Sequence, residues 1–354
     1  MIERQPKASI IVYTSFQDNS KEYDNNWKID FGVEVIRDRA KILLPTTRVN
    51  RAVARIAREK SIKTVAFGAA APLAWMSPTL RRAGVTRIIA LTHGHEVWWS
   101  KLFPFNLIMR RIGQTTDSLT YLGEFTRSAI SKALNSASKA AMFKIAPGID
   151  VEHFKPIDAS DLRNSLGLKN KKVIVSVGRL VHRKGQDFLI KAMPIILKSE
   201  PDAHLLLVGE GPYLHHLQKL ALQNSVVENI SFIGRIQYAD LPRYICVGDI
   251  FVMPSRSRFA GLEVEGLGIV YLEASACGLP VIAGASGGAP DAVLEGVTGF
   301  VVQGTKTSEI ADKAISLLSN SSLREAMGAA GREWIVKEWR WQIWSEKFNA
   351  LLLG

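Results

Sequence analysis

The sequence predicts an α/β protein built from two Rossmann-like, doubly wound domains that face a cleft. Short apolar runs alternate with helical patterns along most of the chain, which is typical of parallel strands joined by helices. Glycine-rich turns follow several of the apolar runs, at the place where such sheets bind ligands. A chain of 354 residues is long enough for two domains, each with its own core.

The first half of the chain shows the less regular alternation. Apolar runs that predict strands lie at residues 8–14, 33–36, 40–44, 63–69, 86–92 and 118–121. Helical patterns lie at residues 46–60, 72–83 and 123–134, and residues 17–30 are polar and typical of turns. The strand at 86–92 leads directly into His93-Gly94-His95-Glu96, so these side chains are expected at the ligand-binding edge of a sheet.

The second half alternates more strictly. Predicted strands lie at residues 172–177, 204–208, 230–233, 250–253 and 279–283. Predicted helices lie at residues 186–197, 241–246, 267–278, 309–318 and 322–336, with one more beginning at Asp291. The tail contains Trp334, Trp339, Trp341 and Trp344 and is too aromatic to lie free in solvent.

Residues 254–300 combine two glutamates with two glycine-rich turns. Glu265 and Glu273 stand eight residues apart, and residues 284–290 form the second turn. Turns that open helices offer clustered N–H groups and the positive end of a helix dipole, which favour an anion. A glutamate beside that anion can accept two hydroxyl hydrogen bonds from a ribose. The pattern therefore indicates a nucleotide site.

The segment RSRFAGLEVEGLGIVYLEASACGLPVIAGASGGAPDAV resembles the retaining glycosyltransferases of family 4, which carry a Glu-x7-Glu signature. It is most similar to the phosphatidyl-myo-inositol mannosyltransferases of actinobacteria, over about residues 85–354. The resemblance implies the GT-B fold, with an acceptor-side domain (1–147), a nucleotide-sugar-binding domain (148–332) and a terminal helix (333–354) that crosses back. It also implies transfer of a hexose, mannose from GDP-mannose, to a phosphoinositide-type lipid or another membrane-associated acceptor.

The motif Gly178-Arg179-x4-Lys184-Gly185 matches the turn that binds the donor diphosphate in this family. A guanidinium and an ammonium placed together can neutralise a diphosphate as it leaves. The resemblance also assigns Glu265 to the sugar and Glu273 to the ribose. The nucleotide-sugar-binding residues that it implies are Gly178, Arg179, Lys184, Gly234, Arg235, Glu265, Gly266, Leu267, Gly268, Ile269 and Glu273. His182 and Arg183 are interpreted as surface residues.

His93 matches a histidine that the family keeps near the donor sugar. The catalytic residues implied are His93, Arg179, Lys184 and Glu265, and the acceptor-side residues are His95, Glu96, Arg256 and Arg258. The favoured reaction is front-side attack, in which the leaving phosphate takes the acceptor's proton and the protein supplies positioning and electrostatics. No metal ion or other cofactor is expected. A metal site at His-x-His-Glu is the alternative, and it lacks a further ligand cluster in the sequence.

The N-terminal region departs from the family pattern. Family members begin with a strand and a Gly-Gly loop that holds the donor phosphate, whereas the first glycine here is Gly32 and no Gly-Gly occurs before residue 287. We therefore expect the N-terminal domain to lack its first βα unit. Because orienting the sugar needs both domains, this loss would reduce turnover more than donor binding.

The basic excess of the chain lies entirely in its first half. Residues 1–148 contain 23 Lys and Arg against 11 Asp and Glu, and the remainder contains 22 of each. Trp98, Trp99, Phe103 and Phe105 stand close to basic residues, which indicates contact with anionic lipid; a packed aromatic helix end is the alternative. With no spanning run, no signal-peptide pattern and two cysteines without metal spacing, we expect a cytoplasmic protein at the inner face of the plasma membrane.

Three other functions compete with this interpretation. They are a sugar-nucleotide epimerase of similar fold, a non-catalytic nucleotide-sugar-binding homologue and a nucleic-acid-binding protein. The last has no matching motif in the sequence, and no nucleic acid is expected as a partner.

Overall fold

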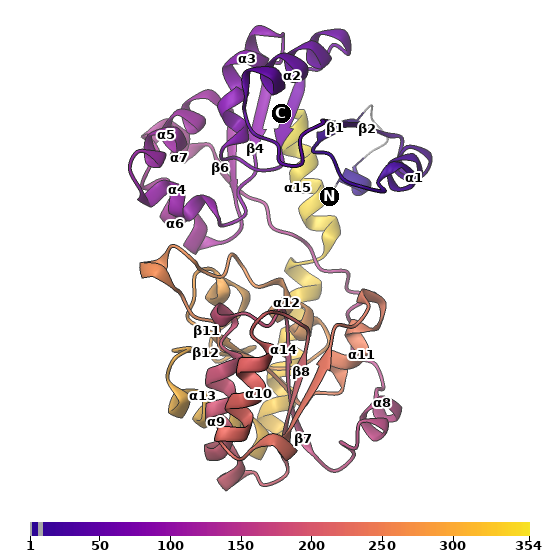
Figure 1. Cartoon of the computed structure of the whole chain (residues 1–354), viewed down its shortest axis with the longest axis vertical. Coiled ribbons are helices and arrows are strands. Elements are labelled where there is room, and N and C mark those ends of the chain that lie inside the picture. Colours follow the sequence, from indigo (N-terminus) through magenta and orange to yellow (C-terminus); the bar gives the residue numbers. More distant parts are fainter. Residues whose placement is uncertain (1, 6–9) are drawn as a thin grey trace. The chain divides into compact units, whose positions relative to one another are not determined.

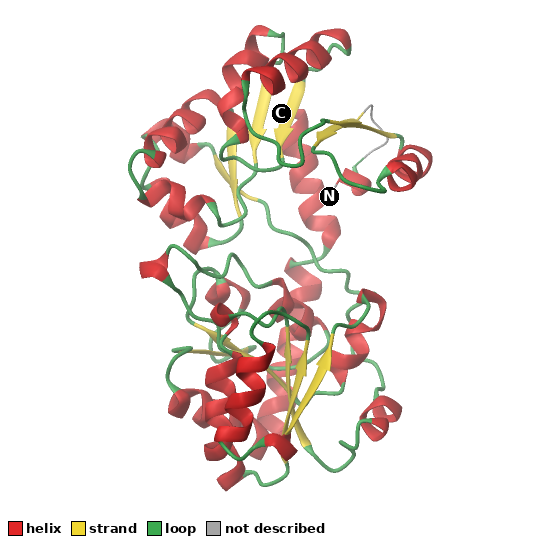
Figure 2. Ribbon diagram, viewed as in Figure 1, coloured by secondary structure: helices red, strands yellow, loops and turns green. Residues whose placement is uncertain are grey.

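The structure, a computed structural model, describes residues 2–5 and 10–354. The chain folds into two units, defined here as unit 1 (Met1–Pro147 and Gln342–Gly354) and unit 2 (Gly148–Trp341). Both are α/β units, and every strand pair between the described strands is parallel (Figures 1 and 2). The prediction of two Rossmann-like domains is confirmed.

Unit 2 contains a six-stranded sheet of order β12-β11-β10-β7-β8-β9. Its strands are β7 (Lys172–Val177), β8 (Ala203–Val208), β9 (Ile230–Gly234), β10 (Ile250–Met253), β11 (Val281–Gly284) and β12 (Gly299–Val302). This is the doubly wound order of dinucleotide-binding sheets, and the direction of winding reverses between β7 and β10. Ligands of such sheets bind outside the carboxyl ends of the strands at that reversal.

Helices cover this sheet and bury β8, β10 and β11 completely, whereas β9 and β12 are only partly buried. The helices are α8 (Ser160–Ser165), α9 (Gln186–Ser199), α10 (Leu214–Gln223), α11 (Leu241–Cys246), α12 (Ile269–Ala276), α13 (Thr307–Ser319) and α14 (Ser321–Glu338). Burial on both faces explains why β8 and β10 are continuous apolar runs. Their residues join α9 and α13 in one core.

The prediction of a helix that begins at Asp291 is wrong. Residues Ala289–Ala292 form only a 3-10 turn, after which the chain turns back towards β12. Gly296, at a φ of 72°, and the hydrogen bond from the N–H of Leu294 to Oγ1 of Thr298 close that second turn. The short distance to β12 therefore leaves no room for an α-helix.

The described part of unit 1 contains two parallel sheets. One pairs β1 (Ile10–Thr14) with β2 (Val33–Arg37), and the other has the order β3 (Thr64–Phe67), β4 (Arg87–Ala90), β5 (Ser118–Tyr121), β6 (Met142–Lys144). Residues 8 and 9 of the first predicted strand lie outside the described residues. The expectation that a βα unit with a Gly-Gly loop is missing from this unit stays a prediction.

Two predictions in this unit are wrong. Residues 40–44 form no strand, because the carboxylate of Asp38 accepts the N–H of Ala40 and bends the chain, which leaves Ile42 exposed. Residues interpreted as turns instead form α1 (Lys21–Phe31), which ends at Gly32 in the left-handed conformation.

The remaining helices of unit 1 pack on the four-stranded sheet or extend beside it. They are α2 (Thr47–Glu59), α3 (Ser77–Arg82), α4 (Glu96–Lys101), α5 (Phe105–Thr115), α6 (Glu124–Ser131), α7 (Ser136–Ala140) and α15 (Trp341–Leu353). In α15, Phe348 and Leu351 pack against Ile89 and Ile145 of the sheet region. The chain returns to unit 1 at Gln342, because α14 and its buried Trp334 still belong to unit 2.

Candidate active site

The turn between β7 and α9 begins and ends at glycines, as its sequence predicts. Residues His182–Lys184 form a 3-10 turn, and Gly185 follows at a φ of 78°. A Cβ at Gly185 would lie 1.9 Å from the carbonyl oxygen of Pro254. Only glycine therefore lets this turn pack against the loop that follows β10.

Glu265 lies between two cations of this turn. Its Oε2 lies 2.7 Å from Nη1 of Arg183 and 2.8 Å from Nζ of Lys184. The side chains of Lys184 and Glu265 are only 10% and 9% exposed, so their electrostatic interaction is stronger than it would be in water. The fold thus brings together two residues that are 81 positions apart, at the reversal point of the sheet.

The sequence predicts Arg183 at the surface, whereas the structure places it in this cluster. Its side chain is 29% exposed, and its guanidinium binds Glu265. The run His182-Arg183-Lys184 before Gly185 was the only signal in the sequence that could have indicated it. Arg179, earlier in the turn, is exposed to solvent, and its side chain can reach a ligand from outside the cluster.

The two glycine-rich segments of residues 254–300 pack against each other. The N–H of Gly288 donates to the carbonyl of Glu265 at 2.8 Å. A Cβ at Gly287, whose φ is 56°, would lie 2.2 Å from the same carbonyl oxygen. Gly268, at a φ of 80°, precedes the first residue of α12. The glycines therefore allow the close contact that puts Glu265, Gly266 and Leu267 beside the second turn, and Ile269 begins α12 directly after them.

Glu273 lies in the second turn of α12 and is largely buried. Burial raises the pKa of its carboxyl from 4.5 to about 7. Among the described residues, no hydrogen bond or ion pair satisfies this carboxylate. A buried acceptor of this kind is suited to paired hydroxyl donors.

Gly234 ends β9, and Arg235 follows it at the same edge of the sheet. The N–H of Gly209, which follows β8, donates to the carbonyl of Gly234 at 2.8 Å. The side chain of Arg235 is 80% exposed and only 3.8 Å from Glu210. Both positions remain open to a ligand at the carboxyl ends of β8 and β9.

The two arginines assigned to the acceptor differ sharply. Arg256 is buried in a bidentate ion pair with Asp187, so its guanidinium is not exposed to an acceptor. Arg258 pairs with Glu263 at 3.1 Å and is about one-third exposed. Only Arg258 has the exposure that contact with an acceptor needs.

In unit 1, β4 delivers His93, His95 and Glu96 as predicted. Glu96 is fully buried, and its Oε2 accepts the N–H of His93 at 2.9 Å. Its Oε1 lies 3.3 Å from Nε2 of His95. Glu96 therefore organises the start of α4 and cannot itself touch an acceptor, whereas both histidines are exposed. No group of three or more His, Cys, Asp or Glu within the described chain is placed to hold a metal ion.

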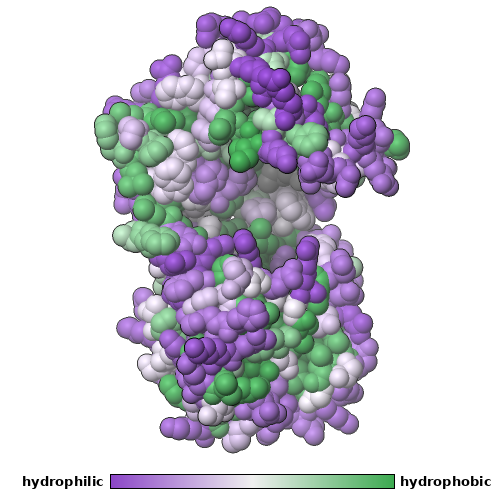
Figure 3. Space-filling view, viewed as in Figure 1, coloured by the Kyte–Doolittle hydropathy of each residue, from purple (hydrophilic) through white to green (hydrophobic). Residues whose placement is uncertain are grey.

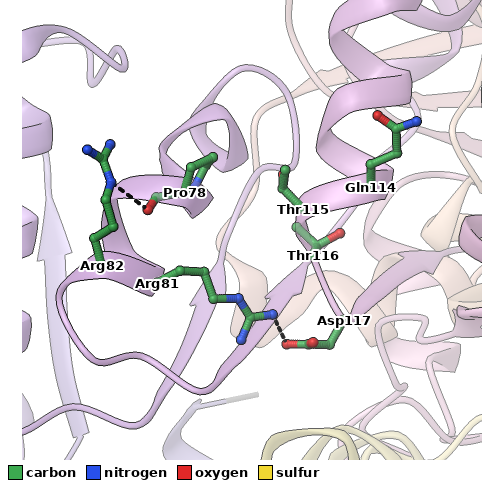
Figure 4. A pocket seen from close by; sticks show the side chains of 7 residues that line it. All are labelled: Pro78, Arg81, Arg82, Gln114, Thr115, Thr116 and Asp117. Atoms are coloured by element: carbon green, nitrogen blue, oxygen red, sulfur yellow. Dashed lines mark hydrogen bonds and ion pairs between the residues drawn. The ribbon is translucent and has the colours of Figure 1, made fainter.

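Unit 1 also has a shallow pocket, lined by the ends of α3 and α5 (Figure 4). Arg81 points at Asp117 and binds it at 2.5 Å, and Nε of Arg82 donates to the carbonyl of Pro78. Its two arginines are thus engaged within the protein, and we assign no ligand to it.

A family model described as "Glycosyl transferases group 1" matches residues 158–334, which include the turn after β7 and both glutamates. The chain belongs to the group 1 glycosyl transferases. It is 44% identical, over 98% of its length and 90% of the relative's, to the GDP-mannose-dependent alpha-(1-6)-phosphatidylinositol monomannoside mannosyltransferase of Mycolicibacterium smegmatis. It is 43% identical, over 99% and 91%, to a GDP-mannose-dependent monoacylated alpha-(1-6)-phosphatidylinositol monomannoside mannosyltransferase of Corynebacterium glutamicum.

Solved structures agree on the fold of this glycosyltransferase. Anabaena Alr3699/HepE in complex with UDP gives a TM-score of 0.80 at 19% identity, covering 97% of this chain and 99% of that one. A sucrose-phosphate synthase from Thermosynechococcus elongatus gives 0.73 at 22% identity, over 90% and 82%. The predicted family and GT-B fold are confirmed. The comparisons favour neither the epimerase nor the nucleic-acid-binding alternative.

Proposed function

We propose that this glycosyltransferase transfers mannose from GDP-mannose to a phosphatidylinositol mannoside lipid. The observation that carries the chemistry is the Glu265 carboxylate held between Arg183 and Lys184 at the reversal point of unit 2. The names of the two mannosyltransferases, which are 43–44% identical over nearly the whole chain, supply the donor and the acceptor.

In this proposal each site residue of unit 2 has one electrostatic role. Arg179, Arg183 and Lys184 neutralise the diphosphate as it leaves, when its charge is greatest. Glu265 accepts hydrogen bonds from the sugar hydroxyls, and Glu273 accepts those of the ribose. Main-chain N–H groups of residues 266–269 face phosphate or sugar, and Gly234 and Arg235 flank the base. His93 on unit 1 stays a prediction for the sugar side.

We further propose that turnover needs no metal ion. The three cations of the turn after β7 supply the charge that a divalent cation supplies to the diphosphate in other transferases. Turnover should therefore be unchanged after treatment with EDTA, and restoration of activity by Mg²⁺ or Mn²⁺ would refute this part.

The acceptor would be reached at a membrane surface by unit 1. On α2, Arg51, Arg55 and Arg58 are exposed. On α4, α5 and the residues between them, Leu102, Phe103 and Leu107 are exposed beside basic residues, and Figure 3 shows hydrophobic surface on this side of unit 1. Nothing in the described chain forms a helix that is both long and apolar enough to span a bilayer. These features suit peripheral contact with anionic lipid.

The test is a transfer assay with a panel of GDP-, UDP- and ADP-sugars and vesicles that contain phosphatidylinositol mannoside. We expect GDP-mannose to be used in preference to the others and the product to retain the donor's anomeric configuration. Glu273→Ala should weaken donor binding by about 1–3 kcal/mol, because it leaves ribose hydroxyls unpaired. Unchanged affinity in calorimetry would remove the ribose assignment, and transfer from another donor only would overturn the mannose assignment.

A further inference from the structure

A bidentate ion pair joins Arg256, in the loop after β10, to Asp187, in the first turn of α9. Nη1 lies 2.6 Å from Oδ1 and Nη2 lies 2.9 Å from Oδ2. The two side chains are 7% and 6% exposed. Removing both ions from water costs about as much as their attraction returns, so such a pair contributes little net stability. Its contribution must therefore be sought in what it holds in place.

Arg256 contacts residues on both sides of Lys184. Its main-chain N–H donates to the carbonyl of Arg183 at 2.8 Å, and its Nη2 lies 2.8 Å from Nδ1 of His182. After the turn, the same guanidinium binds Asp187. One side chain thus ties the start of the 3-10 turn to the start of α9.

Contacts with other loops hold this turn, among them the ion pairs with Glu265 and the packing of Gly185 on Pro254, whereas its internal bonding is weak. Its own main-chain bond runs from the N–H of Lys184 to the carbonyl of Val181 at 3.0 Å, and short 3-10 turns have poor hydrogen-bond geometry. The Phe188 ring, 4.8 Å from the Arg256 guanidinium, and Tyr213, whose hydroxyl donates to Asp187, enclose the ion pair. The buried, enclosed pair is therefore one of the contacts that place the turn.

We propose that Arg256 and Asp187 are positioning residues for glycosyl transfer. The pair fixes the turn so that Arg183 and Lys184 meet the leaving diphosphate in the correct place. This inference rests on the diphosphate role that the proposed function gives to those two cations.

The test is a double-mutant cycle of Arg256→Lys and Lys184→Ala, read as kcat and KM for transfer from GDP-mannose. Arg256→Lys keeps the charge but not the bidentate contact, and a displacement of about 1 Å at such a site costs about a hundredfold in kcat. We expect the single variant Arg256→Lys to lose about a hundredfold in kcat, with a smaller change in KM. In the Lys184→Ala background the loss of kcat should be clearly smaller, because Arg256 acts through the turn and only Arg183 remains there to be positioned. Additive effects on kcat would overturn the inference.

The matched control is Arg163→Lys. Arg163 forms the same kind of pair with Asp249, whose Oδ2 accepts the N–H of Val173 at the opposite edge of the sheet. This variant should lower the thermal unfolding temperature and leave kcat unchanged. If Arg163→Lys loses as much kcat as Arg256→Lys does, the Arg256–Asp187 pair has only a structural role and the inference is overturned. If Arg256→Lys does not fold, Asp187→Asn takes its place in the cycle.

Calorimetry with inorganic pyrophosphate separates this inference from the proposed function, since pyrophosphate has neither base nor sugar. Arg256→Lys should weaken pyrophosphate binding several-fold in the otherwise wild-type protein and by a clearly smaller factor in the Lys184→Ala background. If pyrophosphate binding behaves in this way but the protein does not turn over GDP-mannose, the donor assignment is overturned and the positioning role of Arg256 and Asp187 still stands. No binding of pyrophosphate to the wild type, or additive losses, would overturn the positioning role itself.

Discussion

At the scale of single residues, the site depends on charges that the fold keeps out of water. Lys184 and Glu265 are each about one-tenth exposed and lie 2.8 Å apart. Glu273 is largely buried without a polar partner among the described residues, and its pKa is raised to about 7. Lys184, held in place by Glu265, suits contact with a diphosphate. Glu273 has carboxylate oxygens that can accept hydrogen bonds from hydroxyl groups.

Lys184→Ala should lower kcat roughly a hundredfold, with a much smaller change in KM, because its charge matters most when the diphosphate departs. The measurement is steady-state transfer from GDP-mannose. Lys198→Ala, which removes an exposed lysine from the far end of α9, is the control and should leave both constants unchanged. A change confined to KM would show that Lys184 binds donor and transition state equally.

Glu273 should make stability depend on pH. Its pKa of about 7 in the folded protein lies above the ordinary 4.5, so the folded state holds the proton more tightly. Stability is therefore lost as the pH rises from about 4.5 to 7, by up to about 3 kcal/mol. Glu273→Gln should remove this loss, so unfolding in urea at pH 5 and pH 8 should differ less in the variant than in the wild type. An equal pH dependence in both proteins would contradict the raised pKa.

At the scale of elements, glycines decide how closely the loops at the carboxyl edge of unit 2 approach each other. Gly185 packs on the carbonyl of Pro254, and Gly287 packs on that of Glu265. The turn after β7, the loop after β10 and the turn after β11 therefore form one contiguous surface. A side chain at either glycine would push the loops apart.

Gly287→Ala should lower kcat at least about tenfold, because its Cβ would lie 2.2 Å from the Glu265 carbonyl oxygen and displace the segment that carries Glu265. The matched control is Gly296→Ala. Gly296 also has a positive φ, 72°, but a Cβ there meets nothing within 4 Å. Both variants should lose about 1–2 kcal/mol from backbone strain in thermal unfolding, and only Gly287→Ala should lose activity. Equal kcat values would show that the loop contact does not position Glu265.

At the scale of the whole molecule, charge is divided between the two halves of the chain. The excess of 23 basic over 11 acidic residues lies within residues 1–148, and the rest of the chain is balanced. The described part of unit 1 shows both an arginine-bearing helix face on α2 and exposed apolar side chains around α4 and α5. This division suits a protein in which one unit meets an anionic surface.

Reversing Arg51, Arg55 and Arg58 to Glu should reduce binding to vesicles that contain anionic lipid at least about tenfold, since each surface-near base contributes about 1 kcal/mol. Co-sedimentation at low and high salt measures this, and wild-type binding should fall as salt rises. The control reverses Lys198, Lys219 and Lys306, three exposed lysines of unit 2. The role of α2 would be refuted if wild-type binding did not depend on salt concentration, or if the lysine control lost as much binding as the α2 variant.

Periodicity and glycine placement were enough to predict most of unit 2. Its central strands are buried, and α9 and α12 begin directly after glycines, so local sequence and tertiary structure agree at β7, α9 and α12. The errors fell where local signals were weak. The predicted helix at Asp291 was shortened by the turn at Gly296, and the strand at 40–44 was lost to the Asp38 hydrogen bond.

By itself the sequence determined the α/β class, the Glu-x7-Glu pattern and the pairing of Arg179 with Lys184 in one turn, because each depends on residues close together in the chain. Only the tertiary structure decided that Arg183 joins Lys184 on Glu265, that Arg256 is buried on Asp187 and that Glu96 is buried behind its histidines. These outcomes depend on contacts between elements distant in sequence. Burial sets their energies, and no local pattern encodes how deeply a charged side chain is buried.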